Sequence, residues 1–341
     1  MWEKLLAMVH VDIAIDLGTA NTLVHMRSRG VVLNEPSVVA ICRDGHEVKV
    51  LAVGTDAKRM LGRTPGNITA IRPMKDGVIA DFSVTEAMIK HFIRKAVRRS
   101  FVLRSRLIIS VPAGVTSIEQ KAVREAATSA GVREVHLIEQ PIAAAVGAGL
   151  PVRSARGSMI IDIGGGTTDV AVIALNGLVA SDTLRIAGDE LDQAIVNFMR
   201  KQHNVLIGER TAELIKLRVG SAYPLQEELQ IEVKGRDLLS GVPRSVLVTS
   251  PEVRDALQDH IRQFVSCTKG VLERTPPELA ADIIDQGIVL CGGGAQIKGL
   301  DQLIAQECCL PVRVADNPLH AVVDGVGTVL EDLAGYEDLL L

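Results

Sequence analysis

Residues 159–175 read Met-Ile-Ile-Asp-Ile-Gly-Gly-Gly-Thr-Thr-Asp-Val-Ala-Val-Ile-Ala-Leu. Two apolar runs rich in β-branched residues flank a Gly/Thr turn, which is typical of a β-hairpin. Residues 11–24 have the same form, with an apolar run, a Gly-Thr-Ala-Asn-Thr turn and then Leu23-Val24. The two turns follow Asp16 and Asp162, which are 146 positions apart (162 − 16) in a chain of 341 residues. A spacing close to half the chain predicts two domains of related topology, each beginning with a hairpin.

Strand-like and helix-like segments alternate after the first hairpin. Residues 106–111 and 135–138 are short apolar runs, whereas residues 117–130 and 142–149 have helical composition. This alternation predicts an α/β architecture. Two further stretches interrupt the pattern and are interpreted as insertions. We expect short strands in residues 34–74 and mainly helices in residues 184–249.

Composition excludes several classes of protein. The chain has 37 Lys and Arg against 41 Asp and Glu, a net charge of −4, which argues against nucleic acid as a partner. Apolar residues make up 47% and charged residues 23%, so bulk disorder is excluded. The five cysteines show no C-x-x-C spacing, which argues against a zinc site or a disulfide framework. No run approaches the roughly 20 apolar residues that span a bilayer.

Three glycine turns carry the chemistry of the sequence. They lie at 18–19, 164–168 and 292–294, each at the end of an apolar strand. A single such turn is usually only a turn, but glycine also lets backbone amides approach an anion closely. Asp16 and Asp162 stand beside two of the turns, where carboxylates could hold a hydrated Mg²⁺. The pattern predicts a polyphosphate clamped from both sides, and no Walker G-x-x-x-x-G-K-[ST] motif is present.

The motifs resemble those of a known superfamily. Residues 16–22, 162–169 and 290–295 are similar to the two phosphate motifs and the adenosine motif of the actin/Hsp70/sugar-kinase ATPases. Residues 32–40, 71–81, 207–213 and 275–279 narrow the resemblance to the MreB family of bacterial actins, over essentially the whole chain. Two positions depart from that family: Asp169 stands where Glu is expected, and Gln140 where a second acid is common.

The resemblance implies an actin-like, ribonuclease H-like fold of two α/β domains with an ATP cleft between them. Subdomain IA would comprise 1–33, 75–146 and 320–341, and subdomain IB 34–74. Subdomain IIA would comprise 147–183 and 250–319, and subdomain IIB 184–249.

The resemblance also assigns roles to site residues. Glu139 and Thr167 would orient the attacking water, and Asp16 and Asp162 would hold Mg²⁺ through water, with Asp162 counted among the catalytic residues. The ATP-binding set would be Gly18, Thr19, Ala20, Asn21, Gly164, Gly165, Gly166, Thr167, Gly188, Glu213, Lys216, Gly292, Gly293, Gly294 and Ala295. Without the resemblance, Glu139 could equally stabilise a helix start. Glu213 and Lys216 could equally be an exposed i,i+3 ion pair.

Two segments predict contact with a membrane. Trp2, Leu5, Leu6 and Val9 form the apolar stripe of a short helix. Phe101, Val102 and Leu103 lie among basic residues, where the family places a hydrophobic membrane loop. The alternatives are a terminal helix packed on the protein itself or a frayed terminus, and a basic loop that is simply solvated.

The function implied by the resemblance is that of a slow ATPase coupled to filament assembly. It would form membrane-associated homopolymers on the inner face of the cytoplasmic membrane. There it would direct lateral cell-wall synthesis and rod shape, with a RodZ-type transmembrane adaptor and the cell-wall synthesis machinery as partners. A small-molecule kinase of the same fold remains open. A chaperone-type ATPase would need a peptide-binding domain, and only about fifteen residues follow Gly327.

Overall fold

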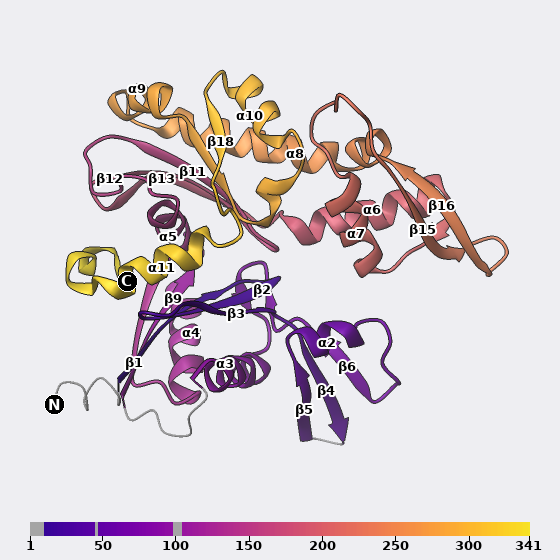
Figure 1. Cartoon of the computed structure of the whole chain (residues 1–341), viewed down its shortest axis with the longest axis horizontal. Coiled ribbons are helices and arrows are strands. Elements are labelled where there is room, and N and C mark those ends of the chain that lie inside the picture. Colours follow the sequence, from indigo (N-terminus) through magenta and orange to yellow (C-terminus); the bar gives the residue numbers. More distant parts are fainter. Residues whose placement is uncertain (1–9, 45–46, 98–103) are drawn as a thin grey trace.

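The computed structural model describes residues 10–44, 47–97 and 104–341, and contains two five-stranded sheets of the same strand order (Figure 1). The first sheet has the order β10-β9-β1-β2-β3 and the second β18-β17-β11-β12-β13. The first comprises β1 (His10–Leu17), β2 (Asn21–Met26), β3 (Gly30–Pro36), β9 (Arg104–Val111) and β10 (Glu134–Glu139). The second comprises β11 (Ser158–Ile163), β12 (Thr168–Ala174), β13 (Gly177–Leu184), β17 (Ile288–Cys291) and β18 (Val312–Val314).

Each sheet opens with the predicted antiparallel hairpin. In the first, Asp16 pairs with Leu23, and in the second, Asp162 pairs with Asp169. The opening strand of each hairpin then pairs in parallel with a later strand, β9 for β1 and β17 for β11. The two halves therefore share one topology, and both Asp side chains lie at the ends of equivalent central strands.

Helices cover the outer faces of the sheets and fill the space between them. α3 (Phe82–Val97) and α4 (Ser117–Ser129) pack on the first half, and α8 (Ser250–Arg274), α9 (Pro277–Gln286) and α10 (Leu300–Cys308) on the second. α5 (Gln140–Gly147) and α11 (Ala321–Glu331) lie between the sheets. Their apolar side chains form a buried cluster with residues of both sheets, including Ile108 and Ile160.

α5 and α11 touch backbone to backbone. A Cβ added at Gly325 would overlap the carbonyl oxygen of Ala143, and one at Gly147 would overlap that of Ala321. Glycine is required at both positions because any side chain would push the two helices apart.

The first insertion forms a small α/β unit beside the first sheet. It contains β4 (Val39–Asp44), β5 (Glu47–Val53), α2 (Thr55–Met60) and β6 (Ile68–Ile71). The two-residue strands β7 (Met74–Lys75) and β8 (Val78–Ile79) follow.

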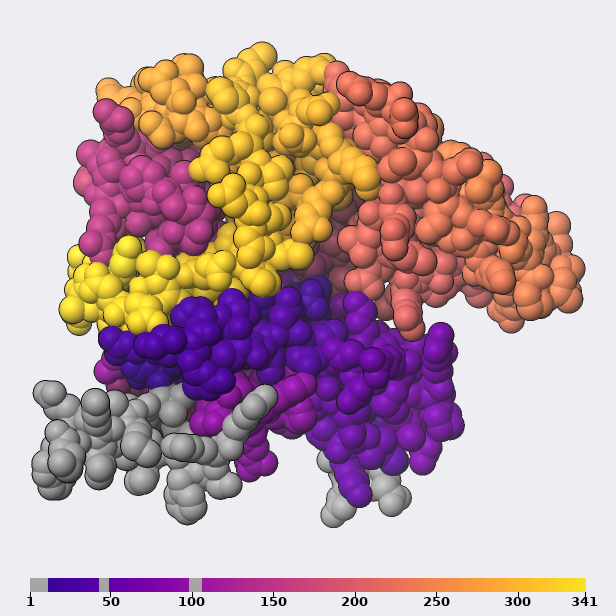
Figure 2. Space-filling view, in the orientation of Figure 1, coloured from indigo at the N-terminus to yellow at the C-terminus, as the bar shows by residue number. Residues whose placement is uncertain are grey.

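The second insertion is less helical than predicted. It contains α6 (Gly188–Gln202), α7 (Glu209–Val219), β14 (Val205–Leu206), β15 (Gln230–Asp237) and β16 (Pro243–Thr249). The two long strands were not predicted because most of their side chains are polar or charged. Most of β15 and β16 is exposed, and only one or two residues of each reach the core. The two insertions lie on the same side of the molecule, on the right in Figure 2.

Within the described ranges, no helix has the length and apolar character needed to cross a bilayer. The predicted membrane residues Trp2, Leu5, Leu6, Val9, Phe101, Val102 and Leu103 lie outside the described residues.

Candidate functional site

A cavity of about 420 Å³ lies between the two halves, and all three glycine turns line it. Most of the predicted site residues meet there: Asp16, Gly18, Thr19, Ala20, Asn21, Asp162, Gly164, Gly165, Gly166, Thr167, Gly188, Glu213, Lys216, Gly292, Gly293 and Gly294. Two predicted residues, Glu139 and Ala295, are absent from the lining. Residues separated by more than 270 positions thus converge on one space, as a clamp for a single ligand requires.

The two phosphate turns approach each other across the cavity. A Cβ on Gly165 would lie 2.5 Å from the Cβ of Ala20, and one on Gly166 would lie 2.7 Å from Oγ1 of Thr19. Side chains at these glycines would therefore separate the halves. The second turn is also tied to the start of α6, because Gly188 N donates to Gly164 O at 3.2 Å.

Asp16 and Asp162 line the cavity beside the two phosphate turns and make this part of it acidic. Asp16 Oδ1 accepts from Ser110 Oγ at 2.7 Å and from Gln140 Nε2 at 3.4 Å. Burial raises the pKa of Asp16, and burial with the charges of Asp169 and Asp16 raises the pKa of Asp162 to about 8. Two neighbouring carboxyls whose pKa values are raised by burial have the electrostatic character of a cation site.

Asp16 and Asp162 together supply fewer ligands than a metal ion needs. Across residues 10–44, 47–97 and 104–341, no three His, Cys, Asp or Glu side chains converge closely enough to coordinate an ion. Any cation between Asp16 and Asp162 would complete its shell with water or with ligand oxygens, as Mg²⁺ usually does.

Glu139 and Gln140 occupy the junction where β10 ends and α5 begins. Glu139 is half-buried and outside the cavity lining, and its side chain makes no capping hydrogen bond to α5. Burial, with the charge of Asp169, raises its pKa. Gln140 is 8% exposed, lines the cavity and reaches the Asp16 carboxylate. Gln140, and not the predicted Glu139, thus lines the cavity together with the phosphate turns.

Asp169, one of the two departures from the family pattern, is buried behind the cavity. Its Oδ1 accepts from Thr183 Oγ1 at 2.6 Å and from Ala113 N at 3.4 Å. The first bond lies within the second sheet, between β12 and β13, and the longer bond from Ala113 N links Asp169 to the loop after β9 in the first half.

Glu213 and Lys216 do not pair with each other, although they are one helical turn apart on α7. Glu213 Oε1 lies 2.8 Å from Lys58 Nζ of the first insertion. Lys216 Nζ donates to Gly188 O at 2.7 Å and lies 2.9 Å from Asp192 Oδ1. Burial raises the pKa of Asp192 to about 6, against the opposing effect of Lys216. The isolated surface ion pair is therefore the wrong interpretation of these residues.

The third glycine turn closes the cavity from the second half. Gly292 has a φ of 78°, and a Cβ there would lie 2.5 Å from Asp162 Oδ1. Ala295 is 4% exposed and sits behind the lining, whereas Gln296 and Ile297 reach it. The adenosine motif thus lines the cavity with the backbone of its three glycines, and Gln296 and Ile297 add their side chains.

Several lining residues carry no signal in the sequence. Lys58, Arg72, Asp189 and Asp192 line the cavity but belong to the two insertions. Their place depends on how the insertions approach each other, which no local motif encodes.

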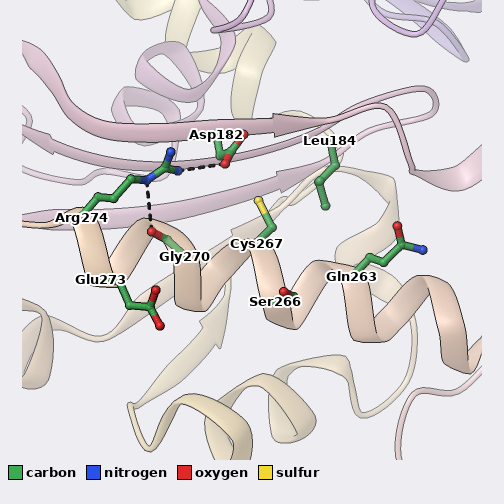
Figure 3. A pocket seen from close by; sticks show the side chains of 8 residues that line it. All are labelled: Asp182, Leu184, Gln263, Ser266, Cys267, Gly270, Glu273 and Arg274. Carbon is green, nitrogen blue, oxygen red and sulfur yellow. Dashed lines mark hydrogen bonds and ion pairs between the residues drawn. The ribbon is translucent and has the colours of Figure 1, made fainter.

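A second pocket, of about 500 Å³, lies between β13 and α8 and has a different chemistry (Figure 3). Arg274 Nη2 pairs with Asp182 Oδ2 at 2.9 Å across it. Burial raises the pKa of the Cys267 thiol to about 12, which keeps it protonated and unreactive. No glycine turn borders this pocket, so the cavity between the halves is the candidate site.

Comparison with known proteins identifies the family of the chain. The profile of the MreB/Mbl protein family matches residues 10–338. The chain is 55% identical over 334 residues to the cell shape-determining protein MreB of Escherichia coli (strain K12), covering 97% of this chain and 96% of that protein. It is 52% identical over 322 residues to the cell shape-determining protein Mbl of Bacillus subtilis (strain 168), covering 94% and 96%.

Solved structures give the same result for the fold. MreB5 of Spiroplasma citri bound to AMPPNP superposes with a TM-score of 0.91 and 34% identity, covering 96% of this chain and 98% of that one. The MamK double helical filament superposes with a TM-score of 0.78 over 94% and 99% of the chains. At 22% identity, the second match shows the fold alone.

Proposed function

The chain belongs to the MreB/Mbl family, and from this premise we propose that it is an ATP-binding bacterial actin that assembles into filaments and determines cell shape. The support comes from relatives named for cell shape and from a structural neighbour solved with AMPPNP. The alternatives of a small-molecule kinase or a chaperone-type ATPase are not favoured, because identity to cell shape-determining proteins extends over 97% of the chain.

One observation carries the nucleotide proposal: two glycine turns from different halves approach so closely that a Cβ on either Gly165 or Gly166 would clash with the other turn, beside the carboxyl groups of Asp16 and Asp162. Ala20 and Thr19 of one turn face Gly165 and Gly166 of the other. A polyphosphate between them would accept hydrogen bonds from backbone amides of both halves. Because one ligand would touch both halves, its binding would favour the closed arrangement, which is how ATP would control assembly.

We assign the Mg²⁺ proposal to Asp16 and Asp162. The fit rests on their raised pKa values and on the absence of a third close ligand among the described residues, which leaves room for water and phosphate oxygens. The ion would neutralise charge on the transferred phosphoryl group, which is the main requirement of phosphoryl transfer.

For hydrolysis, the geometry favours Gln140 over Glu139 as the group that orients water, together with Thr167. Gln140 and Thr167 line the cavity, and Glu139 does not. An amide at this position orients water without accepting a proton, as a glutamine does in some GTPases. Phosphoryl transfer with a loose transition state needs positioning more than a strong base, so the slow hydrolysis expected of a filament ATPase is consistent with this residue.

The remaining assignments of the family stay proposals for this chain. We propose attachment to the inner face of the cytoplasmic membrane through the N-terminal residues and the Phe101 loop. We also propose a RodZ-type adaptor and the cell-wall synthesis machinery as partners. The subdomain boundaries predicted from the sequence belong to the same set.

Sedimentation with nucleotide tests the central proposal. The protein should pellet with ATP and Mg²⁺, remain in the supernatant without nucleotide, and show filaments by electron microscopy. A protein that binds ATP yet stays monomeric at high concentration would favour the kinase alternative.

A further inference from the structure

The two insertions meet at the edge of the cavity through charged side chains. Lys58 Nζ on α2 lies 2.8 Å from Glu213 Oε1 on α7. Arg72, just after β6, places Nη1 3.6 Å from Asp189 Oδ1 and Nη2 4.0 Å from Glu209 Oε2. All the cations stand on the first insertion and all the acids on the second.

These contacts border the cavity rather than lying apart from it. Lys58, Arg72, Asp189 and Glu213 all belong to its lining, and each keeps 26–34% of its side chain exposed. They therefore stand where the cavity wall meets solvent. A ligand leaving toward the insertions would have to pass between them.

Among the residues that the structure describes, no buried apolar cluster joins the two insertions. The buried cluster of Val38, Ala40 and Ala57 is confined to the first insertion. The large cluster that includes Ile207, Ile215 and Val233 takes its members from the second half of the chain. In the described part of the chain, the ion pairs between the insertions are those of Lys58 and Arg72. Such a contact can open without exposing a core, so it is easily reversed.

We propose that Lys58 and Arg72, with their acidic partners, form an electrostatic latch that slows the release of nucleotide from the cavity. The inference rests on the proposed nucleotide binding, and it adds that the latch controls how long the nucleotide stays bound. Half-exposed ion pairs are weak individually and are screened by salt. The latch would thus adjust the lifetime of the bound state without making it permanent.

The experiment measures dissociation of a fluorescent ATP analogue by stopped flow, chased with excess ATP, at low and high KCl. Each cation, taken with its acidic partners, should change the rate by roughly 1.4- to 5-fold. Lys58→Met with Arg72→Met should therefore speed release by about 2- to 30-fold at low salt. At high salt the rates of mutant and wild type should converge.

Two controls separate the latch from a general loss of positive charge. Arg59→Met removes a neighbouring cation that pairs with Asp56 on its own helix, and it should leave release unchanged. Lys58→Arg with Arg72→Lys keeps both charges and should preserve slow release.

A third arm separates the latch from direct contact with the nucleotide. Glu209 lies outside the cavity lining, its side chain is 69% exposed, and its ion-pair partner is Arg72, so we expect it to act on release mainly through Arg72. Glu209→Gln should speed release slightly in the wild type and have no further effect after Arg72→Met.

Unchanged release in the Lys58/Arg72 double mutant at low salt would overturn the latch while leaving nucleotide binding intact. Equally fast release by Arg59→Met would also overturn it. Failure of the wild type to bind the analogue would instead reject the proposed function on which the latch depends.

Discussion

Gly325→Ala should disturb both the stability of the protein and its hydrolysis of ATP. Besides overlapping the Ala143 carbonyl oxygen, the new Cβ would lie 2.7 Å from the Ala143 carbonyl carbon and 2.9 Å from Gly147 N. Carbon contacts are most favourable near 3.5–4.0 Å and the overlap with the oxygen is tighter still, so α5 and α11 would have to separate by at least about 1 Å. Overpacking of this kind costs roughly 1–3 kcal/mol of unfolding free energy. At about 2–4 °C per kcal/mol, the melting temperature should fall by about 2–12 °C.

The same displacement should reach the site, because α5 begins at Gln140. A shift of about 1 Å at a positioning group can slow a reaction by about a hundredfold. ATP binding by the glycine turns should be affected less than turnover.

The measurements are thermal unfolding by circular dichroism and phosphate release at saturating ATP. Gly270→Ala is the matched control, since it makes the same substitution inside a helix where a Cβ would meet nothing within 4 Å. That variant should melt at the wild-type temperature or slightly above it. If Gly325→Ala also melts and hydrolyses like the wild type, the backbone contact between α5 and α11 is not as tight as described.

Three further predictions follow from the site and the termini. Gln140→Ala should slow ATP hydrolysis at least tenfold with little change in ATP affinity, whereas Glu139→Ala should have the smaller effect; phosphate-release assays giving the reverse order would return the water-orienting role to Glu139. Burial raises the pKa of Asp192 to about 6, above its unfolded value, so nucleotide-free protein should lose stability as pH rises from about 4 to 6. That loss should be smaller in Asp192→Asn, because other carboxyls with raised pKa values still contribute, and the same pH dependence of melting temperature in both proteins would contradict it. Liposome co-sedimentation should fall after Phe101→Ser and after deletion of residues 1–9, and normal binding by both variants would reject the membrane proposal.

Local sequence predicted the parts of the site that depend on local backbone. A turn that must expose its amides requires glycine, and an apolar strand leading into it is readable at once, so Asp16 and Asp162 could be placed together. Glu139 and Gln140 show the limit of this reasoning. Both fit a strand-to-helix junction, and only the orientation of the first turn of α5 decides which of them faces the cavity.

The other residues of the site come together through contacts between segments far apart in the sequence. Lys58 and Glu213 meet because two insertions, each folded on its own, are held at a particular distance by the halves that carry them. No motif in either insertion encodes that distance. The strands β15 and β16 were hidden for a different reason, since their polar, exposed surfaces lack the apolar alternation that normally reveals a strand.

The packing of α5 against α11 also has an approximate two-fold symmetry. Each helix follows the last strand of its own sheet, β10 for α5 and β18 for α11. Ala143 and Gly147 on one helix face Gly325 and Ala321 on the other, with the same spacing of four residues on both. Ala143 meets Gly325, and Gly147 meets Ala321, so the same kind of contact occurs twice with the roles of the two helices exchanged. This is the pattern of an isologous two-fold contact. The two halves therefore meet through equivalent positions of equivalent helices, so this contact has the geometry of a dimer interface enclosed within a single chain.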